Sequence, residues 1–466
     1  MKALAVGYND INSAMRLDSS YHLSVGTIYL KKLRSMPHNE LKDITSNIFT
    51  AGRSKRVYTQ EQFGYPYLSN SDVVKQSPLD ASKYNSKKFG YDSASFLKEG
   101  MTVTGRVGAI GQSAYISSEL EDAQAMGSDN IIRIVPRDIT YAGFIYAFIA
   151  SKYGNNLIWR LAAGGVQPYI SEDMLKDMPI PNLTNELKWK IHSLIDEAST
   201  LRVEANKVLN EANRQFHDLN EITYENYHLT VSENAKYYGF KHKVSNNSVL
   251  SIKAKNHSRR ILEIKEIWNT KPGIKLKDYL SAEFRIGPRG SFKRIDSDSV
   301  GVEMVSQSDI HRINPKNFKR VIISREHDED FGKDSQVLFP AVGNGSSEGE
   351  ILFRPTLAYK TFTKKLLSGD IGRLDCPTLE HAAYLLVALK SKGGFRMMRA
   401  FYYGTQLRRP LWEFLKEIKI PIKNDQVFSV VSNLAIKAYD LRHDADIKEN
   451  EAIALLEKQI ESWQKS

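Results

Sequence analysis

The chain has 466 residues, of which 41% are hydrophobic, so it is long enough for two or three domains with cores of their own. It contains a single cysteine, Cys376, which excludes an internal disulfide and a cysteine-based zinc finger. The formal net charge of +11 is typical of proteins with a polyanionic partner, and nucleic acid is the first candidate.

The apolar runs of the sequence indicate a cytoplasmic protein that does not enter a membrane. The first residues lack the continuous apolar stretch of a signal peptide. The longest apolar runs, near YAGFIYAFIA and HAAYLLVAL, are about half of the roughly 20 residues that a membrane-spanning helix needs. We therefore expect a soluble chain.

Residues 1–182 are expected to form a first domain of mixed α/β structure. GMTVTGRVGAIGQSAYI (100–116) alternates apolar residues with glycines, as strands joined by tight turns do. ITYAGFIYAFIASKYG (139–154) indicates a buried helix that is stopped by glycine. In the next motif, LAAGGVQPYISEDMLKDMPIP, Gly164 and Gly165 indicate a turn, and LKDMPIP indicates an apolar strand at the root of the following helix.

Residues 183–222 are predicted to form a first long helix. The preceding PIPN is a helix-start signal, and a helix of about 35 residues would be roughly 50 Å long. Apolar residues recur in steps of three and four, which is typical of the seam between two packed helices. The seam residues are Ile191, Leu194, Ala198, Leu201, Ala205, Val208 and Ala212.

Residues 223–422 repeat the motifs of the first domain in the same order. YLSNSDV corresponds to MVSQSDI, LKDMPIP corresponds to LKEIKIP, and Gly165 and Gln167 correspond to Gly404 and Gln406. TLEHAAYLLVALKSKGG corresponds to the buried helix, again stopped by glycine. The offset drifts only from 235 to 240 residues, so we predict two whole-domain copies. Five positions repeat at an offset of 235: Leu41, Lys42, Asp43, Phe49 and Gly52, at Leu276, Lys277, Asp278, Phe284 and Gly287.

Residues 423–466 are predicted to form a second long helix with the same kind of seam. An amphipathic helix can pack on its own domain, but two narrow stripes in one chain favour packing of the helices on each other. An antiparallel pair would place the domains at opposite ends of one rod and relate them by a pseudo-twofold axis. The DNA double helix has local twofold symmetry of the same kind. The seam residues are Val427, Val431, Leu434, Ala438, Leu441 and Ala445.

This series of motifs resembles the specificity (S) subunit of type I restriction-modification enzymes. The resemblance rests on PYLSNSDV, LKEGMTVTGRVGAIG and GGVQPYISEDMLKDMPIP, followed by a long helix, with the series repeated over essentially the whole chain. In the second copy, FPAVGNGSSEGEILF keeps the glycines but lacks TGRVG. The implied fold is a tandem duplication of mixed α/β target recognition domains, separated by two long antiparallel coiled-coil helices.

The resemblance also implies a function and partners. Each target recognition domain of the family reads one half of a split DNA sequence, and the helices form a spacer that docks two methyltransferase (M) subunits. Restriction (R) subunits join that core in defence against phage. The implied role of this chain is binding of double-stranded DNA without catalysis. S-adenosylmethionine, and ATP with Mg²⁺, would be cofactors of the partner subunits.

The sequence contains no catalytic motif of its own. It lacks the Asn/Asp-Pro-Pro-Tyr/Phe motif that holds a flipped base, and it lacks a Gly-Lys-Ser/Thr phosphate loop. GRVGAIG has the wrong spacing for a dinucleotide loop, and EHDEDF (326–331) is more typical of a solvated loop than of a metal site. We expect no catalytic residue, metal or cofactor here. The alternatives are the specificity subunit of a bipartite type II system, a stand-alone nucleic-acid-modifying enzyme and a coiled-coil scaffold.

Candidate DNA contacts are cationic and amide side chains in loops, because they bind phosphates and the edges of bases. The loops differ between the copies, which predicts an asymmetric bipartite target. Arg202 and Arg442 lie beside the seams and are expected to bond within the helix pair or to a partner subunit. The candidates are Arg53, Lys55, Arg56, Arg106 and Gln167 in the first domain, and Arg285, Arg289, Lys293, Arg294, Asn344, Gln406, Arg408 and Arg409 in the second.

Overall fold

The computed structural model divides the chain into two compact units. Unit 1 contains Met1–Val203 and Asp444–Ser466, and unit 2 contains Glu204–His443. No helix among the described residues combines the length and the apolar character that crossing a bilayer requires. The described residues are 6–8, 11–12, 15–53, 55–81, 83–108, 110–164, 166–223, 251, 253–287, 293–295, 300–316, 318–323, 328–344 and 351–463.

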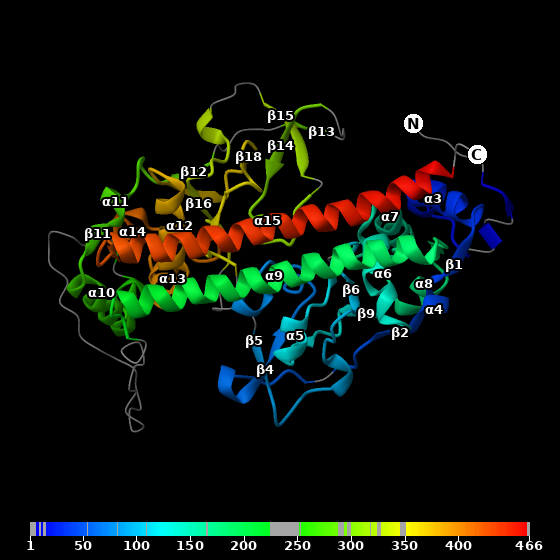
Figure 1. Cartoon of the computed structure of the whole chain (residues 1–466), viewed down its shortest axis with the longest axis horizontal. Helices are drawn as coiled ribbons and strands as arrows, with labels where there is room; N and C mark the ends of the chain where they lie inside the picture. Colours follow the sequence, from blue (N-terminus) through cyan, green and yellow to red (C-terminus); the bar gives the residue numbers. More distant parts are fainter. Residues whose placement is uncertain are drawn as a thin grey trace. The chain divides into compact units, whose positions relative to one another are not determined.

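Two long helices, α9 (Asn185–Leu219) and α15 (Asp425–Ser462), contribute residues to both units (Figure 1). Each helix is two to four residues shorter at each end than the ranges 183–222 and 423–466 that the sequence pattern indicates. The boundary between the two units falls near the middle of both helices, because each half of a helix packs on a different globular part.

Unit 1 contains two four-stranded sheets and one short strand pair. One sheet has the antiparallel order β2-β9-β6-β7. The other has the order β3-β5-β4-β8, in which β4 and β8 run parallel. β1 pairs with β10. The bounds are α2 (Ser19–His22), α3 (Val25–Arg34), β1 (His38–Glu40), α4 (Leu41–Ile44), β2 (Thr45–Thr50), β3 (Tyr58–Thr59), β4 (Gly64–Leu68), β5 (Lys83–Ser86), β6 (Thr102–Gly105), β7 (Ser113–Tyr115), α5 (Ser118–Asp122), β8 (Met126–Gly127), β9 (Ile131–Pro136), α6 (Ala142–Ala150), α7 (Lys152–Leu161), α8 (Glu172–Lys176) and β10 (Pro179–Pro181).

Unit 2 repeats these sheets and the closing strand pair strand by strand, and it has one further strand pair, β20–β21. Its sheets have the orders β12-β19-β16-β17 and β13-β15-β14-β18, and β11 pairs with β22. β14 and β18 run parallel, as β4 and β8 do. The bounds are α10 (Arg259–Thr270), β11 (Gly273–Lys275), α11 (Leu276–Tyr279), β12 (Arg285–Ile286), β13 (Lys293–Ile295), β14 (Val302–Val305), β15 (Lys319–Ile322), β16 (Gln336–Pro340), β17 (Thr356–Leu357), β18 (Leu366–Leu367), β19 (Ile371–Asp375), α12 (Leu379–Lys390), α13 (Lys392–Ala400), β20 (Tyr402–Tyr403), β21 (Arg409–Pro410), α14 (Trp412–Leu415) and β22 (Lys419–Pro421).

The duplication extends to individual side-chain hydrogen bonds. In the YLSNSDV motif, Ser69 Oγ donates to Asp72 Oδ2 at 2.6 Å, and in MVSQSDI, Ser306 Oγ donates to Asp309 Oδ2 at 2.6 Å. The backbone N–H of each serine donates to the same carboxylate. The prediction of two whole-domain copies is therefore confirmed.

The buried helix of each unit ends at a serine, so the prediction that glycine stops it is wrong. Ser151 follows α6 and Ser391 follows α12, and each hydroxyl oxygen caps the next helix by accepting the backbone N–H of Gly154 or Gly394, at 3.2 and 3.1 Å. A Cβ atom on either glycine would lie 2.1 Å from a carbonyl oxygen of the preceding helix. The glycines thus permit the close approach of successive helices.

The LKDMPIP motif and its copy are only partly strands. In each unit, one helical turn, α8 or α14, comes first and buries a leucine, Leu175 or Leu415. The strands β10 and β22 then contain only the last three residues of the motif. The predicted apolar strand is therefore corrected to a helical turn followed by a three-residue strand.

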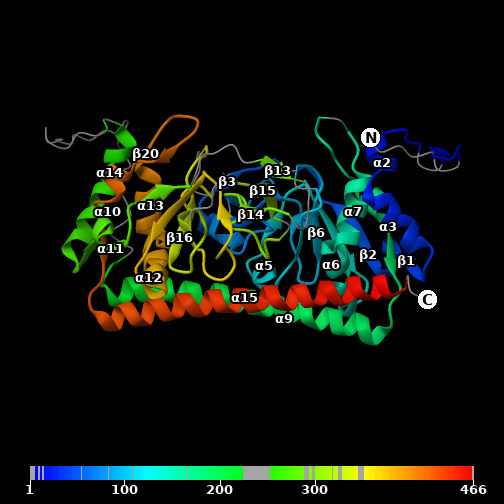
Figure 2. The ribbon, with the colours of Figure 1, turned by 90° about the horizontal axis from the view of Figure 1, so that it is seen from above.

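In each unit, antiparallel segments of α9 and α15 cover one side of the globular part (Figure 2). In unit 1, Ile191 and Leu194 join a core with Leu456 and Ile460. In unit 2, Val208, Ala212, Val431 and Ala438 belong to one core. The cores of the two globular parts therefore continue into the helix pair.

The buried stripe of α15 contains the predicted seam residues Val427, Val431, Ala438 and Ala445 but departs from the prediction at its two leucines. Leu434 and Leu441 are only partly buried, and the next residues, Ala435 and Arg442, are buried instead. The stripe continues through Glu449, which is 2% exposed. On α9, the predicted seam residues Leu194 and Val208 are buried and Leu201 is partly buried.

Charged side chains bridge the helices within this stripe. In unit 1, Arg202 Nη1 donates to Glu449 Oε2 at 2.7 Å, and Nη2 donates to Asp446 Oδ1 at 2.8 Å. In unit 2, Arg442 Nη2 donates to Asn206 Oδ1 at 3.0 Å. Burial and the charge of Glu449 raise the pKa of Tyr146 well above its usual range. Polar groups in a helix seam can be satisfied in one register only, so these bonds specify the register of the pair.

Replacing Arg202 with methionine should strongly destabilise unit 1, because the buried carboxylate of Glu449 and the partly buried carboxylate of Asp446 would both lose this cation. We expect the Arg202→Met variant to lose about 3–5 kcal/mol of unfolding free energy, the usual result of breaking a buried ion pair from one side. Urea denaturation followed by circular dichroism at pH 7 measures this loss.

Arg214 on the same helix provides the control. Its side chain is 59% exposed and pairs with Glu211 and Asp218 on the surface, so Arg214→Met should change the free energy of unfolding by less than about 1 kcal/mol. Equal effects of the two substitutions would contradict a specific role for the buried pair.

Candidate nucleic-acid interface

A hairpin projects from each unit on the side that faces away from α9 and α15 (Figure 2). In unit 1, Ala163 and Tyr169 exchange two backbone hydrogen bonds of 2.9 and 2.8 Å. In unit 2, β20 pairs with β21 so that Tyr403 lies opposite Arg409. These hairpins carry the candidate contacts Gln167 and Gln406.

The glycines of the hairpins fix how the two copies correspond. Gly164 and Gly404 have φ angles of +98° and +87°, in the left-handed region that favours glycine. Each directly follows the last paired residue before the hairpin tip, Ala163 or Tyr403. Gly404 therefore corresponds to Gly164, whereas the sequence alignment matched it with Gly165, which lies outside the described residues.

This shift by one residue changes the correspondence at the hairpin tips. Val166 now corresponds to Gln406, and Gln167 corresponds to Leu407. The relative accessibility of Val166 is 105% and that of Leu407 is 62%, and both glutamines are exposed. Each tip thus presents one glutamine and one aliphatic side chain, in opposite order along the chain.

In unit 1, the backbone of Arg106 connects two loops to the hairpin. Its carbonyl oxygen accepts the N–H of Ile170 at 3.0 Å, and its own N–H donates to Asn130 O at 2.9 Å. Val107 pairs with Tyr169. The partly exposed Arg106 side chain therefore lies at the base of the hairpin that carries Gln167.

Arg53 and Arg56 are linked to the region of Arg106 because both bind the carboxylate of Asp129. Arg53 Nε lies 3.3 Å from Asp129 Oδ2, and Arg56 Nη2 donates to Asp129 Oδ1 at 2.8 Å. Asp129 precedes Asn130, to which Arg106 is bonded. Lys55, between the two arginines in sequence, is exposed. Asp129 and Asn130 thus link Arg53 and Arg56 to Arg106 at the base of the hairpin.

In unit 2, four candidates lie at the equivalent place. Gly343 and Arg408 exchange backbone hydrogen bonds of 2.8 and 3.3 Å, so Asn344, the next residue, lies beside the hairpin. The Arg408 guanidinium lies over the Tyr402 ring at 4.8 Å. Gln406 is exposed at the tip, and Arg409 is partly buried in β21.

The remaining candidates of unit 2 are not gathered there. Arg285 forms ion pairs with Glu329 and Asp375, which engage its guanidinium inside the unit. Lys293 is exposed on β13, where the side chain of Arg294 lies outside the described residues. Arg289 also lies outside them.

The unit 2 residue that corresponds to Arg106 is Ala341. Its N–H donates to Asp370 O at 2.8 Å, as the Arg106 N–H donates to Asn130 O. Unit 2 therefore has an alanine where unit 1 has a cation at this position.

Sequence reasoning missed a pair of buried arginines that support these loops. Arg133 donates to the carbonyl oxygens of Gly127 and Ser95, at 2.6 and 3.0 Å. Arg373 occupies the same place in β19 and donates to Leu367 O at 2.9 Å. Burial lowers the pKa of each guanidinium to about 10. Their recurrence at an offset of 240 in IIRIVP and IGRLDC was a signal that the sequence contained.

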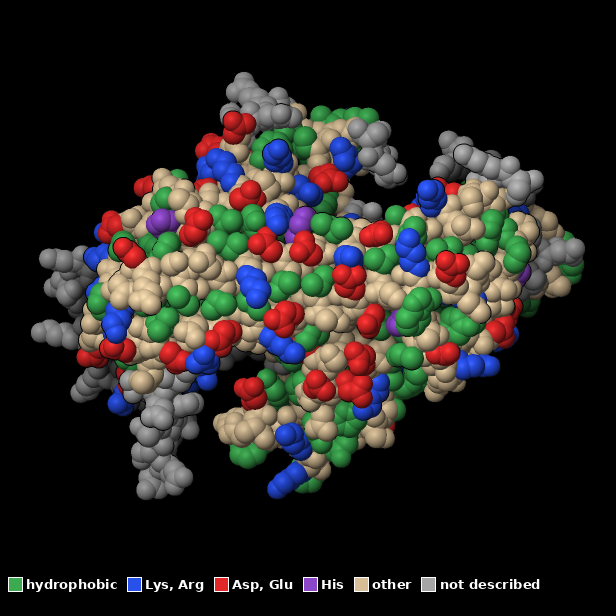
Figure 3. All heavy atoms as spheres, in the orientation of Figure 1, with side chains coloured by type: hydrophobic (Ala, Val, Ile, Leu, Met, Phe, Trp, Pro, Cys, Tyr) green, Lys and Arg blue, Asp and Glu red, His purple; other side chains and the backbone are tan. Residues whose placement is uncertain are grey.

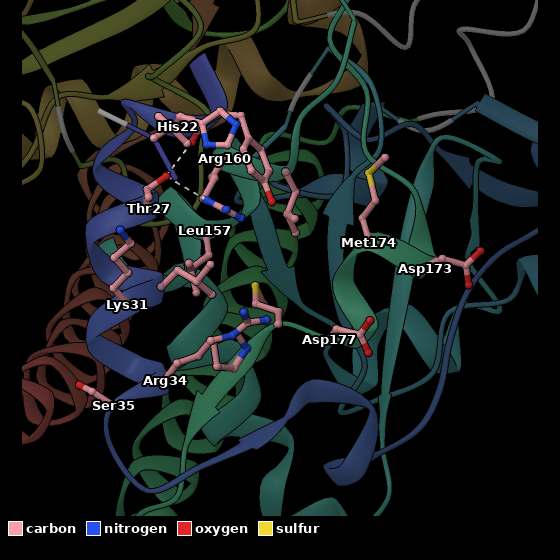
Figure 4. A pocket seen from close by; sticks show the side chains of 16 residues that line it. His22, Thr27, Lys31, Arg34, Ser35, Leu157, Arg160, Asp173, Met174 and Asp177 are labelled. Carbon is pink, nitrogen blue, oxygen red and sulfur yellow. Dashed lines mark hydrogen bonds between the residues drawn. The ribbon is translucent and has the colours of Figure 1, made fainter. Parts of the chain in front are cut away.

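A cavity of about 650 Å³ lies in unit 1 between α3, α7 and α8 (Figure 4). On its wall, Thr27 Oγ1 donates to Tyr21 O at 2.6 Å and accepts from Arg160 Nε at 3.0 Å. Burial lowers the pKa of Arg160. Since its proton is engaged by a carbonyl oxygen, the Thr27 hydroxyl is not activated as a nucleophile.

The described part of the chain contains no group of three or more His, Cys, Asp or Glu side chains that could bind a metal ion. The EHDEDF motif is only partly covered by that statement, because residues 326–327 lie outside the described part. The chemistry of the gathered side chains is that of anion binding and hydrogen bonding, as contacts to phosphates and base edges require.

Arg53 offers a test of phosphate binding, because its side chain is 89% exposed and can be changed without loss of packing. We expect Arg53→Gln to weaken binding to any DNA duplex and to reduce the slope of log K against log salt by about 0.9, the value for one lost phosphate contact. Fluorescence anisotropy over a NaCl series measures both.

The control is Lys98→Gln, which removes a cation paired with Glu121 on α5. An unchanged salt slope in Arg53→Gln, or the same reduction in Lys98→Gln, would argue against a phosphate contact of Arg53.

No protein-family model and no curated protein matches the chain. Among solved structures, the chain is similar to the S subunit of the type I restriction-modification system of M. genitalium, with 12% identity over 91% of this chain and 94% of that chain and a TM-score of 0.34. A structure described as underlying complex assembly and conformational transition of the type I R-M system has 11% identity over 91% and 97%, with a TM-score of 0.26. The HsdS subunit of Thermoanaerobacter tengcongensis has 11% identity over 90% and 95%, with a TM-score of 0.25. The first two are described as parts of type I systems, the family that the sequence motifs resemble; at these TM-scores no residue role is transferred from any of the three.

Proposed function

We propose that this chain is the DNA-specificity subunit of a type I restriction-modification system, and that each unit reads one half of a split target. The observation that carries the proposal is a repeated scaffold with different loops. Strand orders, serine caps and buried arginines recur in both units. In contrast, unit 1 has Arg106 where unit 2 has Ala341, and the hairpin tips differ in sequence. Two readers of unlike half-sites need this combination, because base contacts set the sequence and the scaffold sets the position.

The charge distribution supports DNA binding at the hairpins. The chain carries a formal net charge of +11, and Arg53 and Arg56 are linked through Asp129 and Asn130 to Arg106 at the base of the hairpin of unit 1. The outer surface of the long helices, in contrast, mixes acidic, basic and apolar side chains (Figure 3). A mixed surface attracts a polyanion less than a basic one does.

The helices are proposed to serve as the spacer and as the docking site of two M subunits. Trp189 on α9 and Ile447 on α15 are about half exposed, and exposed apolar side chains of this size suit a protein partner. R subunits would join that core. S-adenosylmethionine, and ATP with Mg²⁺, are then cofactors of the partners, and this chain contributes the specificity of the complex without catalysis.

Genome-wide mapping of methylated bases tests the proposal. Cells expressing this chain with its neighbouring methyltransferase should carry methyl groups within one split motif of two unlike halves. A continuous motif, or methylation without any motif, would contradict two-part reading by this chain.

A graft assigns each half-site to its unit. The strand pairs β1–β10 and β11–β22 close the two globular parts in the same way, so residues 273–421 can be replaced with residues 38–181 at matched junctions. We expect this variant to methylate a split motif whose two halves are the same sequence in opposite orientation. Retention of the original second half would contradict the assignment.

A further inference from the structure

We infer that the aliphatic residues at the hairpin tips, Val166 and Leu407, contact thymine methyl groups in the DNA major groove and thereby help to specify each half-site. This inference rests on the proposed function and names part of its chemistry. An isolated exposed aliphatic residue would need no explanation. Here one occurs at the tip of each of two corresponding hairpins, and each is next to a glutamine.

Contacts from the body of each unit hold the hairpin at the point where it begins, close to its tip. In unit 1, Arg16 donates to the carbonyl oxygens of Leu161 and Ala162 at 3.1 and 2.9 Å, where the hairpin begins. In unit 2, Lys253 Nζ donates to Gly404 O at 2.7 Å. A tip fixed in this way loses little conformational entropy when it binds, so its contacts contribute more of their free energy to affinity.

Lys253 and Arg408 strengthen the hold on the second hairpin. Both cations lie over the ring of Tyr402, at 4.1 and 4.8 Å from its centroid. The Tyr402 ring is buried, so these cation–π contacts link the hairpin to the core of unit 2. The exposed tip therefore projects from a supported base.

The two side-chain types of each tip match the groups of an A·T pair. The major groove admits a two-stranded β-ribbon and presents adenine N6 and N7 to a glutamine amide. It also presents the C5-methyl group of thymine, which apolar side chains contact. A glutamine and an aliphatic side chain on adjacent residues can therefore read neighbouring A·T pairs, and their opposite order in the two tips suits half-sites of different sequence.

Replacement of thymine with uracil isolates the methyl group, because uracil lacks only that group. The complex of this chain with its methyltransferase partner is titrated with duplexes that contain the mapped target, one thymine at a time replaced by uracil. We expect one replacement in each half-site to weaken binding about fourfold, the value for one buried methyl group. Fluorescence anisotropy measures the affinities.

The variants assign each methyl group to a tip. Val166→Ala should bind the thymine duplex more weakly than the wild type and should lose the effect of uracil in one half-site only. Leu407→Ala should do the same for the other half-site. Val25→Ala, which removes another exposed valine in unit 1, should keep both effects.

The outcomes separate this inference from the proposed function. If the complex prefers its target to a scrambled duplex but binds every uracil duplex as tightly as the thymine duplex, the thymine contacts are refuted and the proposed function stands. Uracil effects that persist in Val166→Ala and Leu407→Ala also refute them. If the complex does not distinguish target from scrambled duplex, the proposed function fails and the inference fails with it.

Discussion

The antiparallel strand pair that closes each globular part is the constraint on which the rest of the structure depends. β1 pairs with β10 and β11 pairs with β22, so the chain returns to its point of entry before the long helix begins. Pro181 and Pro421 end the closing strands, and each helix starts four residues later. Because this closure lies at the helix root, the loops on the other side of the sheets can differ without altering the path of the chain into the helix.

Buried arginines then fix the parts that the closure leaves free. Arg133 and Arg373 bond to backbone carbonyl oxygens at the turn after β8 or β18, and with a pKa of about 10 they stay charged at neutral pH. Arg202 bonds to two carboxylates in the helix pair. An unsatisfied buried cation is costly, so each arginine permits one turn conformation or one helix register and disfavours the others.

Both long helices could be predicted from the periodic pattern of apolar residues, and the duplication could be predicted from the repeated motifs. The charged residues within the seam could not be predicted from the sequence. The buried positions Ala435, Arg442 and Glu449 keep the heptad spacing, but the first two lie one residue after the predicted leucines, and an arginine can occupy such a position because its aliphatic stem can be buried. Among the site residues, the types of Arg53 and Arg56 were predictable, but their shared partner Asp129 is more than 70 positions away and is brought near only by the fold.

The hairpins show why identity of residues is a poorer guide than backbone conformation. An alignment by residue identity makes Gln167 correspond to Gln406. The positive φ angles of Gly164 and Gly404 instead make Gln167 correspond to Leu407. The two glutamines therefore occupy different positions on the same supported loop, each beside an aliphatic residue. Under the proposed function, exchanging the order of an amide and an aliphatic group changes the sequence a tip reads while the scaffold stays the same. Under the proposed function, substitutions at these two hairpin positions thus change part of the half-site that a duplicated domain reads.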